Sequence, residues 1–83
     1  MADDKRDRLA ERLRVLRARL DAPPADQAVF ELDLYSYDES LIVAADLLEV
    51  AVPKGARGEM TAEQRMELEA GLAAAGLDVR AAG

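Results

Sequence analysis

Residues 9–20 read LAERLRVLRARL, and this stretch decides how the rest of the chain can fold. Its leucines recur at intervals of four, three and four residues, the spacing of one face of an α-helix. Arginines border this face on both sides. We therefore expect an amphipathic helix over about residues 3–21, with an apolar stripe of Leu9, Leu13, Leu16 and Leu20 flanked by Arg12, Arg17 and Arg19.

The charge of the chain is divided along its length. Residues 1–21 carry seven basic and five acidic side chains, whereas residues 22–83 carry four basic and twelve acidic ones. A basic helix with an apolar stripe beside an acidic remainder indicates docking onto an acidic surface. That surface can belong to the same chain or to another protein, and the alternative of a helix lying on nucleic acid also stays open.

At 83 residues, the chain has room for one small domain, residues 1–83. Because a small domain buries a smaller fraction of its surface than a large one, we expect a protein partner or self-association, most simply a dimer. No stretch approaches the roughly 18 apolar residues of a membrane span, and the first eight residues are charged rather than apolar. We expect no membrane association and a cytoplasmic location.

The pattern predicts a mainly α-helical, three-helix domain with one short extended segment. From Val29 to Tyr35 apolar and polar residues alternate, which predicts an extended segment or strand near residues 28–35. A strand needs a mate, which residues 77–80 or the same segment of a second chain can supply.

The second helix is expected over about residues 39–52. Ser36 or Asp38 can cap its start, and Pro53 ends it. Apolar residues cover more than half of its helical wheel, so we expect it at the centre of the core or at a dimer interface. Residues 48–52 also fit a strand, and the sequence leaves that alternative open.

The third helix is expected over about residues 61–75. Thr61 and Gln64 have the spacing of a capping box, and Gly76 suits the first position beyond the helix. Because this segment is rich in alanine and only weakly amphipathic, we expect a peripheral helix, followed by a loose tail at residues 81–83.

The chain contains no histidine and no cysteine. These residues supply most general bases, thiolate nucleophiles and transition-metal ligands. Asp33, Asp38 and Glu39 lie close in sequence, but their spacing matches no calcium loop. We expect no catalytic residue, no metal site and no cofactor.

Residues 38–41 read Asp-Glu-Ser-Leu and open the predicted second helix near the middle of an acidic chain. In this the segment resembles the acyl carrier proteins, whose phosphopantetheine-bearing serine lies in an Asp-Ser-Leu motif at the start of their second helix. The resemblance is confined to this part of the chain, and Glu39 replaces the aspartate of the motif. It implies that Ser40 carries the prosthetic group; the alternative is a serine that caps the helix.

A second motif, Gly-x-x-Gly with two cations, occurs at residues 54–58. Lys54, Gly55, Arg57 and Gly58 could present backbone amides and positive charge to a phosphate. The motif is superficially similar to the nucleic-acid clamp of KH domains. The net charge of −6 opposes non-specific binding to nucleic acid, and a flexible connector is the alternative.

The sequence thus predicts a small non-enzymatic interaction or regulatory subunit that docks through the leucine stripe, while its flanking arginines select an acidic partner surface. One alternative is a carrier protein modified at Ser40. Another is a small regulator or antitoxin-like protein that binds nucleic acid through Arg12, Arg14, Arg17 and Arg19.

Overall fold

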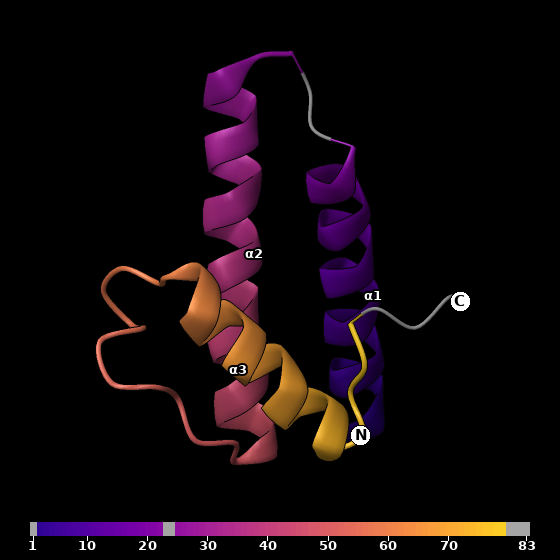
Figure 1. Cartoon of the computed structure of the whole chain (residues 1–83). Coiled ribbons are helices and arrows are strands. Elements are labelled where there is room, and N and C mark those ends of the chain that lie inside the picture. Colours follow the sequence, from indigo (N-terminus) through magenta and orange to yellow (C-terminus); the bar gives the residue numbers. More distant parts are fainter. Residues whose placement is uncertain (1, 23–24, 80–83) are drawn as a thin grey trace.

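The computed structural model describes residues 2–22 and 25–79. It contains α1 (Ala2–Asp21), α2 (Gln27–Leu48) and α3 (Ala62–Ala74), and no strand occurs among the described residues. α1 and α2 run antiparallel as a hairpin, and α3 packs across it on one side (Figure 1). The predicted mainly helical, three-helix fold is confirmed.

The core lies where the three helices meet. Leu13 of α1, Leu41 of α2 and Leu72 of α3 have no exposed surface. Burying a side chain of this size contributes about 2 kcal/mol. The buried cluster also includes Leu68 of α3, so the prediction of a peripheral third helix is wrong. A narrow apolar stripe is sufficient to bind α3 to its neighbours despite its many alanines.

The segment expected to be extended, residues 28–35, is helical, and that prediction is wrong. α2 begins at Gln27, where the Asp26 carboxylate accepts a hydrogen bond from the N–H of Ala28 at 2.9 Å. A helix satisfies its backbone groups internally, whereas a single strand leaves them without partners. The apparent alternation arises because Leu32, although apolar, lies on the solvent-facing side of the helix.

The other expected bounds of the second helix are also wrong. Ser36 and Asp38 lie inside α2 rather than at its start. The helix ends at Leu48, because Glu49 adopts a left-handed backbone conformation, with φ of 58°, and caps it. The residues that follow are irregular, so the strand alternative at residues 48–52 is wrong as well.

The capping box expected at the third helix is present. The Thr61 hydroxyl accepts a hydrogen bond from the N–H of Gln64 at 3.1 Å, and the Gln64 side chain accepts one from the N–H of Thr61 at 2.9 Å. Gly76 follows the Ala75 cap with φ of 98°, a conformation that favours glycine. The expected tail at residues 81–83 lies outside the described residues.

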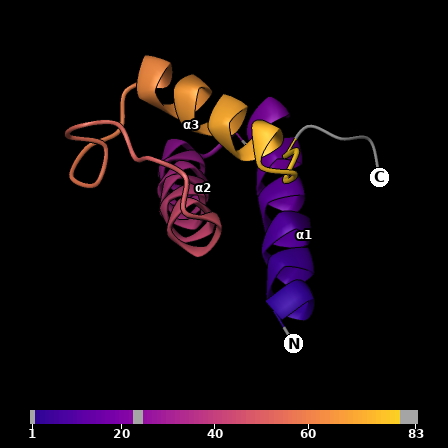
Figure 2. The same cartoon turned by 90° about the horizontal axis from the view of Figure 1, so that it is seen from below.

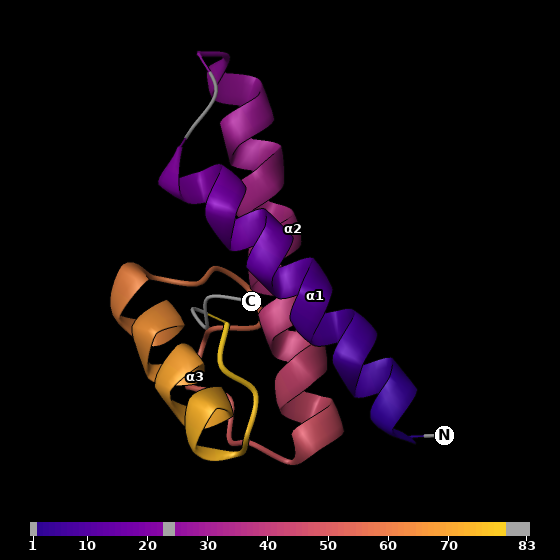
Figure 3. The same cartoon turned by 90° about the vertical axis from the view of Figure 1, so that its right-hand side faces the viewer.

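The segment after α3 returns towards α1 (Figure 3). Leu77 and Val79 are 1% and 3% exposed and belong to the core. The side chains of Arg6 and Arg14 in α1 donate hydrogen bonds to backbone oxygens of this segment. Residues 77–79 therefore cover one edge of α1 as an irregular segment instead of pairing with a strand.

Candidate docking surface

The leucine stripe of α1 lies inside the protein. Leu13 and Leu16 are 0% and 7% exposed, and Leu9 and Leu20 are partly buried against the same core. Side chains that pack against the rest of their own domain cannot contact a partner at the same time. The stripe is thus the core-facing side of an amphipathic helix. Of the alternatives that the sequence leaves open, this is the packing of the helix against its own chain.

The arginines beside the stripe separate to two edges of α1. At the edge nearer α3, Arg17 Nη1 lies 2.9 Å from Glu69 Oε2 and Arg17 Nε lies 3.5 Å from Asp21 Oδ1. The Tyr37 hydroxyl donates to the same oxygen of Glu69, and the Arg17 guanidinium carbon is 6.0 Å from the centre of the Tyr37 ring. We call Arg17, Tyr37 and Glu69 the inner polar cluster; it joins all three helices.

The environment of this cluster disfavours further negative charge. Burial, and then the adjacent Glu69 carboxylate, raise the pKa of Tyr37 because both oppose formation of tyrosinate. The sequence pattern does not reveal the cluster, because Tyr37 falls between the expected strand and the expected helix. The signal that could have found it is the helical spacing of Asp33, Tyr37, Leu41 and Ala44, all of which are buried.

A second ion pair joins α2 to α3. Arg65 donates two hydrogen bonds to the Asp38 carboxylate, at 2.6 Å and 2.9 Å. These hydrogen bonds raise the pKa of Arg65, although partial burial opposes the shift. Both side chains are largely shielded from solvent, so this pair helps to hold α3 in place.

At the opposite edge of α1, Arg12 and Arg19 face α2. Arg12 Nε donates to Ser40 Oγ at 3.2 Å, and Arg19 Nη2 lies 3.2 Å from Asp33 Oδ1. The Arg19 side chain keeps 55% of its surface exposed, while that of Asp33 keeps only 11%. These contacts fix the register of the hairpin and leave both arginines at its surface.

Exposed apolar side chains gather on this same side of the hairpin. Six large hydrophobic side chains are exposed among the described residues, and four of them lie here: Val15, Val29, Leu32 and Val43. The last three follow one another along α2 at helical spacing, with Ser36 between them. Val15 and Ser36 line one shallow hollow of about 360 Å³, together with Arg12, Arg19 and Asp33.

We call this surface the α1/α2 face. Its apolar residues are Val15, Val29, Leu32 and Val43, and Arg12 and Arg19 form its basic edge. α3 lies on the other side of the helical hairpin, and no helix of the described chain covers the α1/α2 face (Figure 2). Exposed apolar surface rimmed by charged groups is typical of protein interaction sites.

Ser40 does not occupy the place that the acyl carrier resemblance implies. It lies inside α2 rather than at the start of a helix, and it is 6% exposed. Its Oγ accepts the hydrogen bond from Arg12. Attachment of a prosthetic group to this oxygen needs an accessible hydroxyl, which the packing of α1 against α2 does not leave.

The Gly-x-x-Gly motif at residues 54–58 forms a turn whose backbone binds within the chain. The Gly55 carbonyl accepts hydrogen bonds from the N–H groups of Gly58 and Glu59, at 3.2 Å and 3.4 Å. The Lys54 carbonyl accepts one from the Gln64 side chain at 2.8 Å. Amides that are already bonded inside the turn are not directed at a phosphate.

The cation of this turn is also engaged. Arg57 donates to both carboxylate oxygens of Asp46, at 3.2 Å and 2.6 Å. These hydrogen bonds lower the pKa of Asp46 and raise that of Arg57. The turn is thereby tied to the exposed side of α2, which is the arrangement of a structural connector.

The four arginines considered for nucleic-acid binding do not share a surface. Arg14 Nε donates to the Asp78 carbonyl at 3.2 Å, and Arg17 belongs to the inner polar cluster. Arg12 and Arg19 lie at the opposite edge of α1. A phosphate backbone could not contact all four on one face of this helix.

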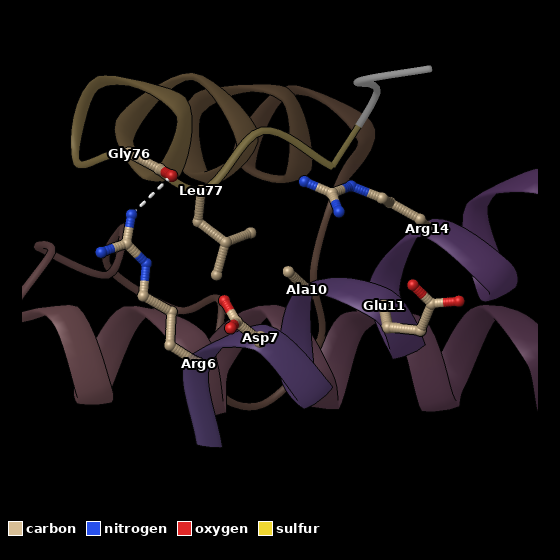
Figure 4. Close-up of a pocket in the computed structure, with 7 residues that line it drawn as sticks. All are labelled: Arg6, Asp7, Ala10, Glu11, Arg14, Gly76 and Leu77. Atoms are coloured by element: carbon tan, nitrogen blue, oxygen red, sulfur yellow. Dashed lines mark hydrogen bonds between the residues drawn. The ribbon is translucent and has the colours of Figure 1, made fainter. Parts of the chain in front are cut away.

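A larger hollow lies between the first half of α1 and the segment after α3 (Figure 4). It measures about 570 Å³, and its charged lining residues are Arg6, Asp7, Glu11 and Arg14. Arg6 Nη2 donates to the Gly76 carbonyl at 2.6 Å across this hollow. Two basic and two acidic side chains give neither an anion nor a cation a consistent environment, so the hollow does not indicate a ligand.

The acidic residues considered for a cation are separated as well. Asp33 faces Arg19 on one side of α2, and Asp38 faces Arg65 on the other. Within the described ranges, no three or more acidic, histidine or cysteine side chains are grouped in a way that could hold a metal ion. In the same part of the chain, no helix combines the length and the apolar composition that a bilayer crossing requires.

Comparison with known proteins gives no match. No protein-family model matches this chain, and no curated protein or solved structure matches it either.

Proposed function

We propose that this chain is a small, non-enzymatic protein-interaction module of the cytoplasm, and that it docks through the α1/α2 face. The observation that carries this proposal is the coincidence of four exposed apolar side chains with two arginines on the one side of the hairpin that α3 does not cover. The leucines of α1 form the core beneath this surface, so they support the docking residues and do not touch the partner.

The composition of the face suits reversible association. Leu32 is 66% exposed, Val15 50% and Val43 49%, so covering them removes apolar surface from water. Complete burial of such a side chain contributes about 1.5–3 kcal/mol. Arg12 and Arg19, which line the hollow between α1 and α2, favour a partner that brings acidic groups beside apolar ones, since charges at an interface govern specificity and the rate of encounter.

The two alternative functions have less support from the same geometry. A carrier function requires an accessible Ser40, and that hydroxyl is buried under Arg12. A nucleic-acid function requires a continuous basic surface, and the arginines of α1 divide between two edges. Neither alternative uses the exposed apolar residues of α2.

A comparison of two substitutions tests the proposal. Leu32→Arg places a charge within the α1/α2 face, and Met66→Arg places the same charge on α3, where the side chain is 63% exposed. The wild type and both variants serve as bait for proteins of the source organism, the chain itself included. We expect a specific binder that the wild type and Met66→Arg retain and Leu32→Arg loses. Equal retention by all three proteins would contradict docking through this face.

A further inference from the structure

We infer that the α1/α2 face pairs with the same face of a second copy of this chain, so that α1 of each chain lies over α2 of the other. The inference rests on the proposed function and names the partner. The result is an antiparallel four-helix bundle of two packed hairpins, with one α3 on each outer side, a packing that amphipathic helical hairpins readily adopt.

Charge complementarity between the two helices supports this pairing. α1 carries seven basic and five acidic residues, whereas α2 carries five acidic residues and no basic one. At the surface, Arg12 and Arg19 form the basic edge on α1, and the exposed Glu39 lies beside Ser36 and Val43 on α2. Each chain therefore presents one helix of each sign to a partner.

The symmetry of a dimer then decides which helices meet. A two-fold axis parallel to the helices, in the plane of the face, places each α1 over the partner's α2. A two-fold axis in the same plane but at right angles to the helices places α1 over α1, and Arg12 and Arg19 would face the same basic edge of the partner. Because like charges across an interface are strongly unfavourable, the charges select the first arrangement.

The register inside one hairpin fixes the register between chains. Arg12 bonds to Ser40 and Arg19 to Asp33, so Val15, which lies between these arginines on α1, is level with Ser36. Rotation about a two-fold axis parallel to the helices does not change the position of a residue along them. It places Val15 against Ser36 of the partner subunit and Arg12 beside Glu39 of the partner subunit.

The size of the face is sufficient for a specific dimer. α1 and α2 have 20 and 22 residues, so the hairpin is about 30 Å long. Two helices side by side are about 20 Å wide, which gives about 600 Å² on each chain and about 1,200 Å² in total. This area is at the lower end of the range for specific interfaces, so we expect a dimer that dissociates on dilution.

Disulfide trapping tests this arrangement, because the chain has no cysteine of its own. A Val15→Cys chain is mixed with a Ser36→Cys chain and oxidised mildly. We expect the mixed, covalent dimer as the main product, since a disulfide forms only when the two Cα atoms lie within about 7 Å. Val15→Cys mixed with Met66→Cys is the matched control and should give no such product. Trapping of Val15→Cys with itself in preference to Ser36→Cys would overturn the arrangement.

Charge reversal provides an independent variant. Arg12→Glu should weaken the dimer, and Arg12→Glu combined with Glu39→Arg should restore it, with light scattering as the readout. Failure of the double variant to restore the mass would contradict the predicted juxtaposition. If no mixed disulfide forms and a different protein binds in a Leu32-dependent way, the second copy is excluded while docking through the α1/α2 face still holds. If Leu32→Arg has no effect on any association, both proposals fail.

Discussion

The two edges of α1 carry the same residue type in different surroundings. Arg17, at the inner edge, is three-quarters buried against Glu69 and Tyr37, whereas Arg12 and Arg19, at the outer edge, stay exposed beside Val15. The inner edge joins three helices, and the outer edge adjoins a surface that no helix of the described chain covers. The flanking arginines are therefore not equivalent. The element that packs against each edge of α1 determines whether an arginine there stabilises the fold or remains available for a partner.

The largest expected difference is between two apolar residues of α1 that stand two positions apart. Leu13 has no exposed surface and Val15 is 50% exposed. Leu13→Ala should lower the free energy of unfolding by about 3 kcal/mol, because it removes buried contacts and leaves a cavity. Val15→Ala should change it by less than about 0.5 kcal/mol. Urea unfolding at a protein concentration low enough to keep the chain monomeric measures both, and similar losses would show that the leucine stripe is not the core.

The second expected difference is between the stability costs of removing an arginine from each edge of α1. Arg17→Ala removes the guanidinium that lies 2.9 Å from the Glu69 carboxylate, which is 7% exposed, and should cost about 2–3 kcal/mol of stability. Arg12→Ala removes one hydrogen bond to Ser40, whose hydroxyl can bond to its own helix, and should cost less than about 1 kcal/mol. Thermal and urea unfolding measure the two values. An equal cost at both edges would contradict the distinction.

The third prediction is a loss of stability in alkaline solution. Because burial and Glu69 raise the pKa of Tyr37, the folded state binds the phenolic proton more tightly than the unfolded state does. The contribution of Tyr37 to the free energy of unfolding is fully present below about pH 10. Above that pH it falls by up to about 1.4 kcal/mol per pH unit. Urea unfolding between pH 8 and 11 should reveal this slope in the wild type and in Tyr35→Phe. The slope should disappear in Tyr37→Phe, and its persistence there would contradict the assignment.

The smallest expected effect separates stability from docking. Glu49 holds a left-handed conformation at the end of α2, which glycine adopts without strain. Glu49→Gly should raise the free energy of unfolding by about 0.5–1 kcal/mol. It lies outside the apolar residues and the basic edge of the α1/α2 face, so association measured by light scattering should not change. A large change in association would place the docking surface at the end of α2 instead.

Sequence patterns predicted α1 and the capping box of α3 because both signals are local. Leucines at helical spacing and the pair Thr61 and Gln64 specify their structure without reference to distant residues. The first half of α2 could not be predicted in this way. There, the exposed Leu32 produces an alternation of apolar and polar residues that is typical of a strand. The contacts that favour a helix, those of Tyr37 with α1 and α3, join residues that are far apart in the sequence.

The candidate docking surface was only partly visible in the sequence. The sequence places arginines on both sides of the leucine stripe, and the structure shows Arg12 and Arg19 at one edge of α1 and Arg17 at the other. The apolar contribution of α2 is not visible in the sequence, because Val29 and Leu32 fall in the segment whose alternation predicts a strand, and because the leucine stripe of α1 is the more prominent apolar surface. Which face of a helix is left open depends on how the helices pack, and no local pattern contains that information.

The most direct test of the account is the solution mass of three proteins by light scattering: the wild type, Leu32→Arg and Met66→Arg, each over a range of concentrations. We predict that the mass of the wild type and of Met66→Arg rises with concentration towards twice the 9.0 kDa chain mass. We predict the single-chain mass for Leu32→Arg, with unchanged helix content by circular dichroism. A wild type that remains at the single-chain mass at every concentration would contradict self-pairing, and a dimeric Leu32→Arg would contradict the α1/α2 face as its interface.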